Sequence, residues 1–569
     1  MAITQRALCL ISALSVGLAL SAPKPIVKRL SVPIPMRDGV RLSANIFLPS
    51  EHGRMPAILV RTPYNKGGDI TPNYQAFVEH GYAVVVEDVR GRYESEGAFQ
   101  PLHQEPADGD DTLNWIARQS WSDGKIGMMG GSYVGIVQWK VAPLNNPHLK
   151  AIFPVVSGWD DYRDRFYSTG GAMKLGNRLE WMAENLRAPG YHQDFARYVL
   201  HLPVRTSDIA ALGWTSPMYH DVADHPAFDK FWQAISVKQQ IAKVKVPVFA
   251  VGGWYDNFVE SDLDAYAALH KSSGLSRIVV GPWPHNMSYR FEDVDFGPDS
   301  SVPVRSLQME WFDQWLMGKD SKLVSEPPVR VFMMGSNQWL EAHEWPPEQA
   351  RAQMFYLDSG GLANSLEGDG VLSAQPKEEA ADRFVFDPNE PVPTRGGPVC
   401  CNPKVFPWGP MDQRAVEQRK DVLVYTTRPL KHDVEAVGPV QVVLYIATTA
   451  RDTDFTAKLV DVFPDGTARN LTDGILRLRY RNSLEKPELG TPGEVYRVTI
   501  DAGVTGNVFL KGHRIRVEVS SSNFPRFDRN PNTGGLVADA TRLLKASQTV
   551  FHGKEHPSCL VLMVMPGKG

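Results

Sequence analysis

Six short runs in the first half of the chain are apolar on both faces, and each is followed by a glycine or proline turn. They are residues 56–61, 82–87, 126–129, 151–156, 247–251 and 277–280. Strands that are apolar on both faces need cover on both sides, which is typical of a parallel sheet between layers of helices. Helix-like segments at 111–118 and 307–316 lie between or after these runs. The pattern predicts an α/β fold.

The pattern of apolar and polar residues changes twice further along the chain. Residues 161–237 are rich in aromatic side chains and lack alternating strands, so we expect a mostly helical insertion over the sheet. In residues 513–519 apolar and charged side chains alternate, which predicts a half-exposed strand. A chain of 569 residues is also too long for one core. We predict an α/β domain formed by 23–160 and 238–350, a helical cap insertion of 161–237, and a jelly-roll β-sandwich of 351–569.

The first 22 residues have the composition of a secretory signal. Arg6 supplies a positive charge before an apolar run at 7–19, and Ser21 and Ala22 are small residues suited to cleavage. The run is short for a membrane span. An N-terminal anchor and a buried helix are the alternatives. We expect residues 1–22 to be a signal peptide, the mature protein to be secreted or periplasmic, and no stable membrane insertion.

Charge and cysteine content narrow the classes of partner and cofactor. The formal net charge is −4 with no long basic stripe, so we expect no nucleic acid partner and favour a small-molecule substrate, while a homo-oligomer stays open. Without the signal three cysteines remain, Cys400, Cys401 and Cys559, and a disulfide from Cys559 to either of the others is possible. The sequence has no C-x-x-C pair, the pattern that would indicate a zinc site. Residues 108–111 contain three aspartates but lack the other ligands of an EF-hand. We predict neither a metal nor a cofactor.

The sharpest local signal is Lys-Ile-Gly-Met-Met-Gly-Gly-Ser-Tyr-Val-Gly at residues 125–135. A short apolar strand ends at Gly130, Ser132 occupies a tight turn, and a helix follows. Such a strand–turn–helix unit lifts the serine hydroxyl above the sheet, and the helix start places N–H groups where an oxyanion would form. Val134 stands where the pattern G-x-S-x-G has its second glycine. On pattern alone, a glycine-rich turn with a capping serine therefore remains the alternative.

A serine nucleophile needs a base, and the base needs an orienting carboxylate. On an α/β-hydrolase domain they follow the serine in the order acid, then histidine, each past the end of a strand. Asp256 comes just after the run at 247–251, and His285 just after the run at 277–280. The helical insertion would explain the long stretch between Ser132 and Asp256. The order of the three residues favours a catalytic triad over a structural histidine.

Several motifs around these strand ends point to one family. They are Thr-Pro-Tyr at 62–64, Asp-Val-Arg-Gly-Arg-Tyr at 88–93, Trp-Ser-Asp-Gly-Lys-Ile-Gly at 121–127, Gly-Gly-Ser-Tyr-Val-Gly at 130–135, Gly-Gly-Trp-Tyr-Asp at 252–256, Gly-Pro-Trp-Pro-His at 281–285 and Ser-Ser-Asn-Phe-Pro-Arg at 521–526. Together they resemble the cocaine-esterase (CocE/NonD) family of serine hydrolases. That family is related to X-prolyl dipeptidyl peptidases, α-amino-acid ester hydrolases and glutaryl-cephalosporanate acylases. Its nucleophile motif is G-x-S-Y-x-G, which Gly135 satisfies.

The resemblance implies roles for five residues. Ser132, Asp256 and His285 would be the triad, and the backbone N–H of Tyr133 with the phenol of Tyr64 would form the oxyanion hole. A tyrosine hydroxyl is a good donor to developing negative charge. Without the resemblance, Tyr64 would be an ordinary aromatic residue on a turn.

The substrate pocket is less closely defined. In the α-amino-acid ester hydrolases acidic residues follow the triad aspartate, but positions 257–259 here are Asn, Phe and Val. We therefore expect Phe258, with Trp159, to contact an apolar acyl group. Asp160 and Asp161 lie near another acidic position of that subgroup, so an aminoacyl substrate stays an alternative.

The sequence thus predicts an exported serine hydrolase that cleaves acyl esters through an acyl-enzyme intermediate. Two alternatives use the same triad on amides, namely a β-lactam side-chain acylase and an X-prolyl dipeptidyl peptidase. A third is a non-catalytic, hydrolase-like protein that binds carbohydrate. The presence of all three triad residues argues against this last alternative.

Overall fold

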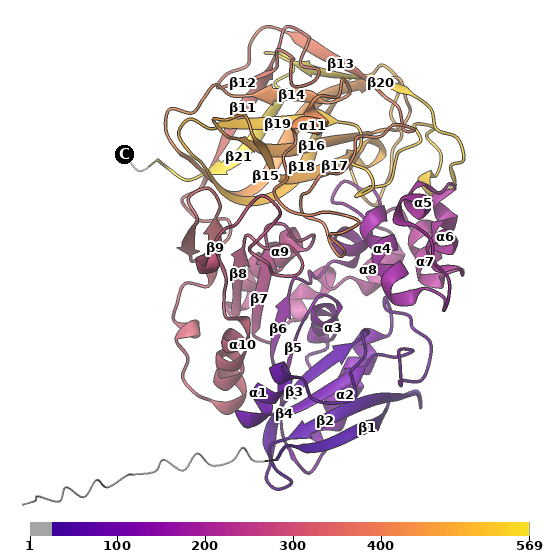
Figure 1. The fold of residues 1–569 in the computed structure, drawn as a ribbon, viewed down its shortest axis with the longest axis vertical. Helices are drawn as coiled ribbons and strands as arrows, with labels where there is room; N and C mark the ends of the chain where they lie inside the picture. Colours follow the sequence, from indigo (N-terminus) through magenta and orange to yellow (C-terminus); the bar gives the residue numbers. More distant parts are fainter. Residues whose placement is uncertain (1–24, 568–569) are drawn as a thin grey trace, which may run out of the picture.

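The chain folds around two large sheets, one in each half of the sequence (Figure 1). The computed structural model describes residues 25–567, so the predicted signal peptide lies outside the described residues. The first sheet has ten strands and the second has eleven. In Figure 1 the second sheet lies above the first, and the helices that follow β6 lie to one side.

The first sheet is parallel in its centre and antiparallel at both edges. Its order is β1-β2-β4-β3-β5-β6-β7-β8-β9-β10, with parallel pairing from β4 through β9. The strands are β1 (Val27–Pro35), β2 (Arg41–Leu48), β3 (Met55–Thr62), β4 (Ala83–Asp88), β5 (Ser122–Gly131), β6 (Leu149–Val155), β7 (Val248–Gly253), β8 (Ser276–Gly281), β9 (Val329–Met333) and β10 (Gln338–Ala342). All six predicted apolar runs form strands of this sheet, β3 to β8, and the α/β prediction is confirmed.

Helices cover both faces of this sheet, as the apolar strands require. Ile58 and Leu59 are neighbours on β3, yet they belong to different apolar clusters. The cluster of Leu59 includes α2 (Glu105–Ala117) and α3 (Tyr133–Val141). The cluster of Ile58 includes α1 (Pro72–Glu79) and α10 (Val304–Phe312). The helix α9 (Val259–Ser273) connects β7 to β8. The sheet is thus the middle layer of three.

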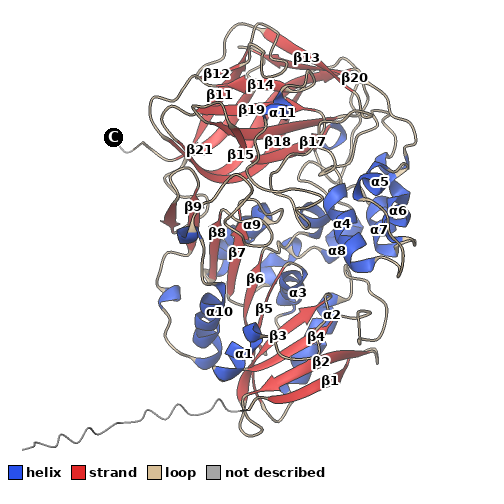
Figure 2. Ribbon diagram, in the orientation of Figure 1, coloured by secondary structure: helices blue, strands red, loops and turns tan. Residues whose placement is uncertain are grey.

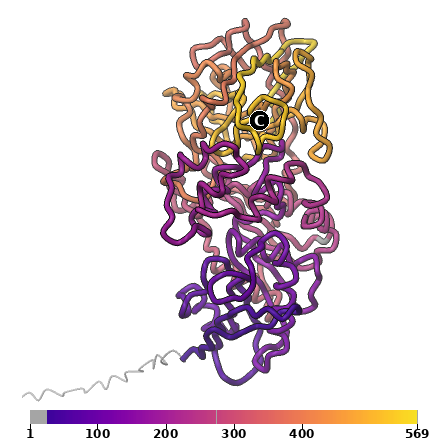
Figure 3. Tube along the Cα trace, turned by 90° about the vertical axis from the view of Figure 1, so that its right-hand side faces the viewer, coloured from indigo at the N-terminus to yellow at the C-terminus, as the bar shows by residue number. Residues whose placement is uncertain are grey.

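The segment between β6 and β7 is helical. It contains a π-helical turn, η2 (Asp161–Phe166), followed by α4 (Leu175–Leu186), α5 (Phe195–Leu200), α6 (Ser207–Leu212), α7 (Pro217–Asp224) and α8 (Lys230–Ile235). Figures 2 and 3 show these helices grouped at the level where the two sheets meet. Aromatic rings pack in its interior. The rings of Tyr162 and Trp232, for example, meet edge to face with their centroids 5.4 Å apart. This group is called the helical segment below.

The second sheet forms an all-β domain. Its order is β13-β20-β15-β21-β11-β12-β14-β19-β16-β17, with β18 paired to β15. The strands are β11 (Arg351–Asp358), β12 (Val371–Ser373), β13 (Ala380–Phe386), β14 (Leu423–Thr426), β15 (Val434–Thr448), β16 (Asp454–Val462), β17 (Ala468–Arg477), β18 (Tyr496–Phe509), β19 (Arg514–Ser520), β20 (Ala546–His552) and β21 (Cys559–Val564), with one short helix, α11 (Arg414–Glu417). Its assignment as a jelly roll stays a prediction.

The strand predicted at 513–519 is present as β19, but it is not half-exposed. Arg516 and Glu518 are only 8% and 4% exposed. Arg516 pairs with Glu417 of α11 at 2.6 Å, and Lys458 of β16 pairs with Glu518 at 3.0 Å. Buried ion pairs cover the face that period-two alternation assigned to solvent.

The two sheets share one apolar cluster. It includes Trp254 and Val331 from the first half of the chain and Val437 and Leu444 from the second. Two backbone hydrogen bonds also link the sheets: the Met334 N–H donates to the carbonyl oxygen of Gly506 at 2.9 Å, and the Val508 N–H donates to that of Met334 at 2.8 Å. The all-β domain is therefore packed against the first sheet where β9 ends and β18 passes it. Among residues 25–567, no helix is both long and apolar enough to cross a membrane.

Candidate active site

Ser132 lies in a strained turn between β5 and α3. Its backbone has φ 56° and ψ −129°, values that a residue with a side chain rarely adopts. Its N–H donates to the carbonyl oxygen of Val155 on the adjacent strand β6 at 2.9 Å. A Cβ on Gly130 would lie 2.2 Å from a side-chain carbon of α3, and one on Gly135 would lie 2.5 Å from Ser157. Both glycines are thus required for the close approach of strand and helix.

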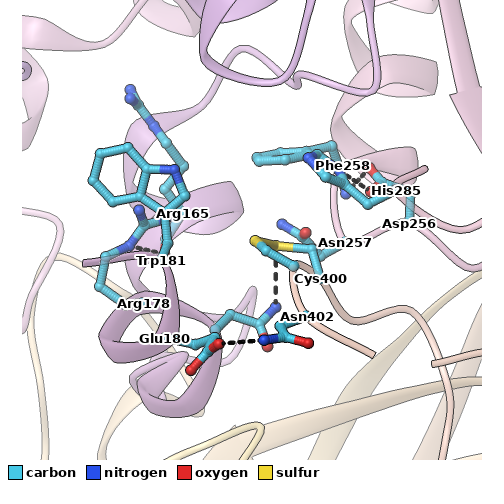
Figure 4. Close-up of a disulfide and its surroundings, with 12 residues drawn as sticks. Arg165, Arg178, Glu180, Trp181, Asp256, Asn257, Phe258, His285, Cys400 and Asn402 are labelled. Atoms are coloured by element: carbon cyan, nitrogen blue, oxygen red, sulfur yellow. Dashed lines mark hydrogen bonds and ion pairs between the residues drawn. A yellow bond between two sulfur atoms is a disulfide. The ribbon is translucent and has the colours of Figure 1, made fainter. Parts of the chain in front are cut away.

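Asp256 and His285 meet past the ends of two neighbouring parallel strands, β7 and β8. His285 Nδ1 lies 2.6 Å from Asp256 Oδ2 (Figure 4). Asp256 is fully buried, and its other carboxylate oxygen accepts the Phe258 N–H at 3.0 Å. The His285 side chain keeps 15% of its surface exposed. A buried carboxylate at Nδ1 favours the tautomer that leaves Nε2 unprotonated, as a base requires.

Tyr64 follows β3 and reaches the same pocket as Ser132. Its hydroxyl oxygen accepts the indole N–H of Trp181, on α4, at 3.0 Å. An indole N–H can only donate, so this bond leaves the phenolic proton of Tyr64 free to donate elsewhere. In the sequence, Trp181 is only one of several aromatic residues in 161–237. Its hydrogen bond to Tyr64 could not be predicted without the fold.

Tyr133 is held in place by buried polar groups behind the serine. Its phenol donates to Glu105 at 2.6 Å, and Arg61 pairs with the other oxygen of Glu105 at 2.7 Å. Burial raises the pKa of the Tyr133 phenol well above its ordinary value, so the phenol is a stable donor. The ring stacks on Trp181 with centroids 6.2 Å apart. The Tyr133 N–H starts α3, where no intrahelical acceptor is available.

Ser132, Tyr64 and Tyr133 line one cavity, called the Ser132 pocket below, whereas Asp256 and His285 are not among its lining residues. The pocket is narrow, with about 30 Å³ of room for a water-sized molecule. The α/β part, the helical segment and the all-β domain all contribute to its lining. The lining residues are Tyr64, Pro101, Leu102, Ser132, Tyr133, Ile136, Arg165, Phe166, Arg178, Trp181, Met218, Phe258, Cys400 and Cys401.

The two residues predicted to contact the acyl group are placed differently. Phe258 lines the Ser132 pocket, with its ring centroid 5.8 Å from that of His285. Trp159 does not line it. Its ring lies 6.1 Å from that of Trp139 in the core, and its backbone N–H donates to Ser261 at 3.1 Å. The structure therefore does not bring Trp159 to the pocket, because the chain after β6 directs this side chain into the core.

Asp160 and Asp161 do not face the Ser132 pocket either. Asp160 pairs with Arg163 at 2.7 Å, and Asp161 forms ion pairs with Lys140 and Arg165. Both carboxylates are thus committed to neighbouring cations. No carboxylate is among the described residues that line the pocket.

The cysteines pair differently from the possibility raised by the sequence. Cys400 and Cys401 are bonded to each other, while Cys559 is a buried free thiol at the start of β21. The adjacent pair sits on a loop of the all-β domain, residues 397–409, which is called the disulfide loop below. Asn402 Nδ2 ties this loop to the helical segment by donating to Glu180 at 3.0 Å (Figure 4). A fixed place in β21 keeps Cys559 away from the disulfide loop.

The described residues contain no group of three or more His, Cys, Asp or Glu side chains placed to hold a metal ion.

Comparison with known proteins identifies relatives along nearly the whole chain. Residues 38–287 match the X-Pro dipeptidyl-peptidase (S15) family, and residues 322–561 match the X-Pro dipeptidyl-peptidase C-terminal non-catalytic domain. Cocaine esterase of Rhodococcus sp. (strain MB1 Bresler) is 40% identical over 566 residues, covering 94% of this chain and 98% of that protein.

Solved structures agree with this relationship. An α-amino acid ester hydrolase has a TM-score of 0.82 at 28% identity, covering 97% of this chain and 100% of that one. An aminopeptidase from the marine sediment archaeon Thaumarchaeota archaeon has a TM-score of 0.84 at 26% identity, covering 98% and 99%. The fold is thus an S15-type α/β-hydrolase-like domain followed by an all-β domain. This chain is a serine ester hydrolase and belongs to the cocaine-esterase-like (CocE/NonD) family.

Proposed function

We propose that the protein hydrolyses acyl esters through a covalent acyl-enzyme on Ser132. His285 is the general base, Asp256 orients it, and Tyr64 and Tyr133 form the oxyanion hole. The observation that carries this proposal is the contact of His285 with a fully buried Asp256, next to a pocket that Ser132 and Tyr64 both line.

Each of these groups has one role in the proposed reaction. Ser132 Oγ attacks the ester carbonyl carbon while His285 Nε2 accepts its proton. The carbonyl oxygen becomes negatively charged and receives hydrogen bonds from the Tyr133 N–H and the Tyr64 hydroxyl. His285 then gives its proton to the departing alkoxide oxygen. Water, activated by the same histidine, attacks the acyl-enzyme and releases the acid.

Apolar side chains from three parts of the chain favour an apolar acyl group. Phe258 follows β7, Phe166 belongs to the helical segment, and Cys400 belongs to the all-β domain. We propose that the helical segment acts as a cap, since its Trp181 and Met218 complete the lining. Burial of such surface contributes roughly 25 cal/mol per Å².

A second cavity of about 430 Å³ adjoins the Ser132 pocket. The two share Pro101, Leu102 and Met218, and the second is also lined by Phe99 and Trp214. We propose that it accepts the leaving alcohol. Its size and aromatic walls suit a bulky group.

The lining of the Ser132 pocket supports hydrolysis of aminoacyl amides less well than hydrolysis of esters. An X-prolyl peptidase must bind the ammonium of its substrate, and a buried ammonium needs a carboxylate to offset its desolvation. The charged residues that line the Ser132 pocket are Arg165 and Arg178, which would repel it. The pocket therefore favours neutral or anionic acyl esters over aminoacyl amides.

The test is a panel of 4-nitrophenyl esters and 4-nitroanilides that share acyl groups of increasing length. We expect ester turnover, with a burst of nitrophenol equal to one equivalent of enzyme where deacylation is slow. Anilides should be hydrolysed far more slowly. Absence of ester turnover, together with absence of labelling by a fluorophosphonate, would overturn the proposal.

We propose further that the protein is exported, on the basis of the signal-like residues 1–22. Expression of the full chain in a Gram-negative host tests this. The mature N-terminus should begin at Ala22 or Pro23, in the periplasm or the medium. A protein that keeps Met1 in the cytoplasm would contradict export without affecting the enzymatic proposal.

A further inference from the structure

Two guanidinium groups line the Ser132 pocket, and the proposed chemistry uses neither. Arg165 forms an ion pair with Asp161. Arg178, in the first turn of α4, pairs with no carboxylate among the residues that the structure describes. Its Nε and Nη2 both donate to the carbonyl oxygen of Arg165, at 3.3 and 2.9 Å. A backbone carbonyl does not neutralise a cation.

The surroundings of Arg178 are apolar. Its guanidinium carbon lies 4.6 Å from the ring centroid of Phe166 and 5.5 Å from that of Trp181. Burial lowers the pKa of Arg178 to about 9, with the neighbouring charge of Arg165 as a further cause. In Figure 4, Arg178 and Trp181 lie on one side of the view and Phe258 and His285 on the other, with Cys400 between them.

Two acidic side chains of the same region are committed elsewhere. Glu180, on the same helix, accepts the phenol of Tyr198 at 2.6 Å and the amide of Asn402 at 3.0 Å. Asp161 is shared by Arg165 and Lys140. The counter-charge of Arg178 must therefore come from solvent or from a ligand, and an uncompensated cation in such surroundings is costly.

We propose that Arg178 binds a carboxylate at the far end of an otherwise apolar acyl chain, so that the preferred substrates are monoesters of dicarboxylic acids. The Arg165 carbonyl occupies the Nε–Nη2 edge of the guanidinium. The Nη1–Nη2 edge can still offer two parallel donors, which match a carboxylate in shape. The aromatic faces of Phe166 and Trp181 would exclude water from this contact. The inference deepens the proposed ester hydrolysis and rests on it for its kinetic test.

The kinetic test compares pairs of 4-nitrophenyl esters that differ only in a terminal carboxylate or carboxamide. Succinyl, glutaryl and adipyl esters place the terminal group at three successive distances from the carbonyl carbon. We expect the carboxylate ester to have at least tenfold higher kcat/KM than its carboxamide partner for at least one chain length, after subtraction of the rate without enzyme. A ratio within twofold for all three lengths would overturn the inference, while turnover of the neutral esters would leave the proposed function intact.

The variants Arg178→Met and Arg178→Lys identify the residue responsible. Methionine keeps an unbranched apolar side chain without the charge, so the ratio should fall to within twofold of one, and lysine should restore part of it. Because both esters are measured on one preparation, the ratio is independent of any loss of folded enzyme. An unchanged ratio in Arg178→Met would overturn the inference.

A binding measurement separates this inference from the catalytic proposal. Calorimetry on Ser132→Ala, which needs no turnover, compares monomethyl glutarate with glutaramate methyl ester, which differs only by a terminal carboxamide in place of the carboxylate. We expect at least tenfold tighter binding of monomethyl glutarate, and loss of that difference in the Ser132→Ala/Arg178→Met double variant. Equal binding of the two compounds would contradict the role of Arg178 even if ester hydrolysis were never observed.

Discussion

The two sheets contribute to the Ser132 pocket in different ways. The first sheet places Ser132, Asp256 and His285 directly past the ends of β5, β7 and β8. The all-β domain reaches the pocket only through the disulfide loop, whose base is closed by two hydrogen bonds between Gly397 and Gly409 at 2.9 and 3.1 Å. Groups on strand ends are held with the accuracy that bond making needs, whereas a loop can vary without disturbing them. Changes in the first region should therefore affect kcat, and changes in the second should affect KM.

The largest expected effect is that of Ser132→Ala. Loss of the nucleophile should lower kcat for esters by about 10⁴-fold or more. Thermal unfolding should stay within a few degrees of the wild type, since alanine fits wherever serine does. Stopped assays on 4-nitrophenyl butyrate measure the loss. Residual activity within tenfold of the wild type would sink the assignment of Ser132.

The oxyanion tyrosine should come next. Tyr64→Phe removes one donor to the transition state, so kcat should fall by roughly 10²-fold with little change in KM. Steady-state kinetics on an ester of low KM separate the two constants. If the substitution changed only KM, the phenol would contact the bound substrate without stabilising the transition state. Tyr64 would then be a substrate-binding residue.

Trp181 should show a smaller effect that depends on Tyr64. Trp181→Phe keeps an aromatic ring but removes the N–H that orients the phenol, a bond worth about 1 kcal/mol, so kcat should fall about fivefold. In the Tyr64→Phe background the same substitution should cost almost nothing further. A double-mutant cycle measures this coupling. Additive losses would show that Trp181 acts by packing instead of through Tyr64.

The disulfide loop should affect binding more than chemistry. Cys400→Ser/Cys401→Ser removes the bond that fixes two lining residues, so KM for large acyl esters should rise about threefold, the size of one modest lost packing contact. We expect kcat to change by less than twofold. Cys559→Ser is the matched control, because that thiol lies in the β-domain core and should leave KM alone. A drop confined to kcat would break the proposed division between the two sheets.

The smallest effect concerns an ammonium in the pocket. Phenylacetyl esters should exceed phenylglycyl esters with the same leaving group by about twofold to threefold in kcat/KM at pH 8, because an α-amino group with a pKa of about 8 can enter uncharged. Lowering the pH to 6.5 should widen the ratio as the ammonium form grows. A preference for the aminated ester would show that a carboxylate does reach the pocket.

The strands of the first sheet could be predicted because their signals are local, and the candidate triad is proposed from signals of the same kind. Short stretches of sequence are enough to recognise the apolar runs, the glycine turns and the strand ends that carry serine, aspartate and histidine in this order. The position of Ser132 in a strained turn between β5 and α3 matches that prediction. Asp256 and His285 likewise follow the ends of two adjacent parallel strands, β7 and β8.

What could not be predicted depends on contacts between distant parts of the chain. Trp159 turns into the core because Trp139 lies there, and no local pattern reveals that direction. The charged faces of Arg516 and Glu518 are covered by partners from other elements. Likewise, Cys400 reaches the Ser132 pocket from a different domain. Each of these needs the tertiary structure, not the period of the sequence.

The most direct test of Ser132 as nucleophile is the location of the covalent adduct. Incubation with a fluorophosphonate, followed by intact mass measurement and peptide mapping, should give one adduct per chain, on the peptide that contains Ser132. Ser132→Ala should give none, although its His285–Asp256 pair remains. A single adduct on any other residue, or full ester turnover by a protein that forms no adduct, would contradict the assignment.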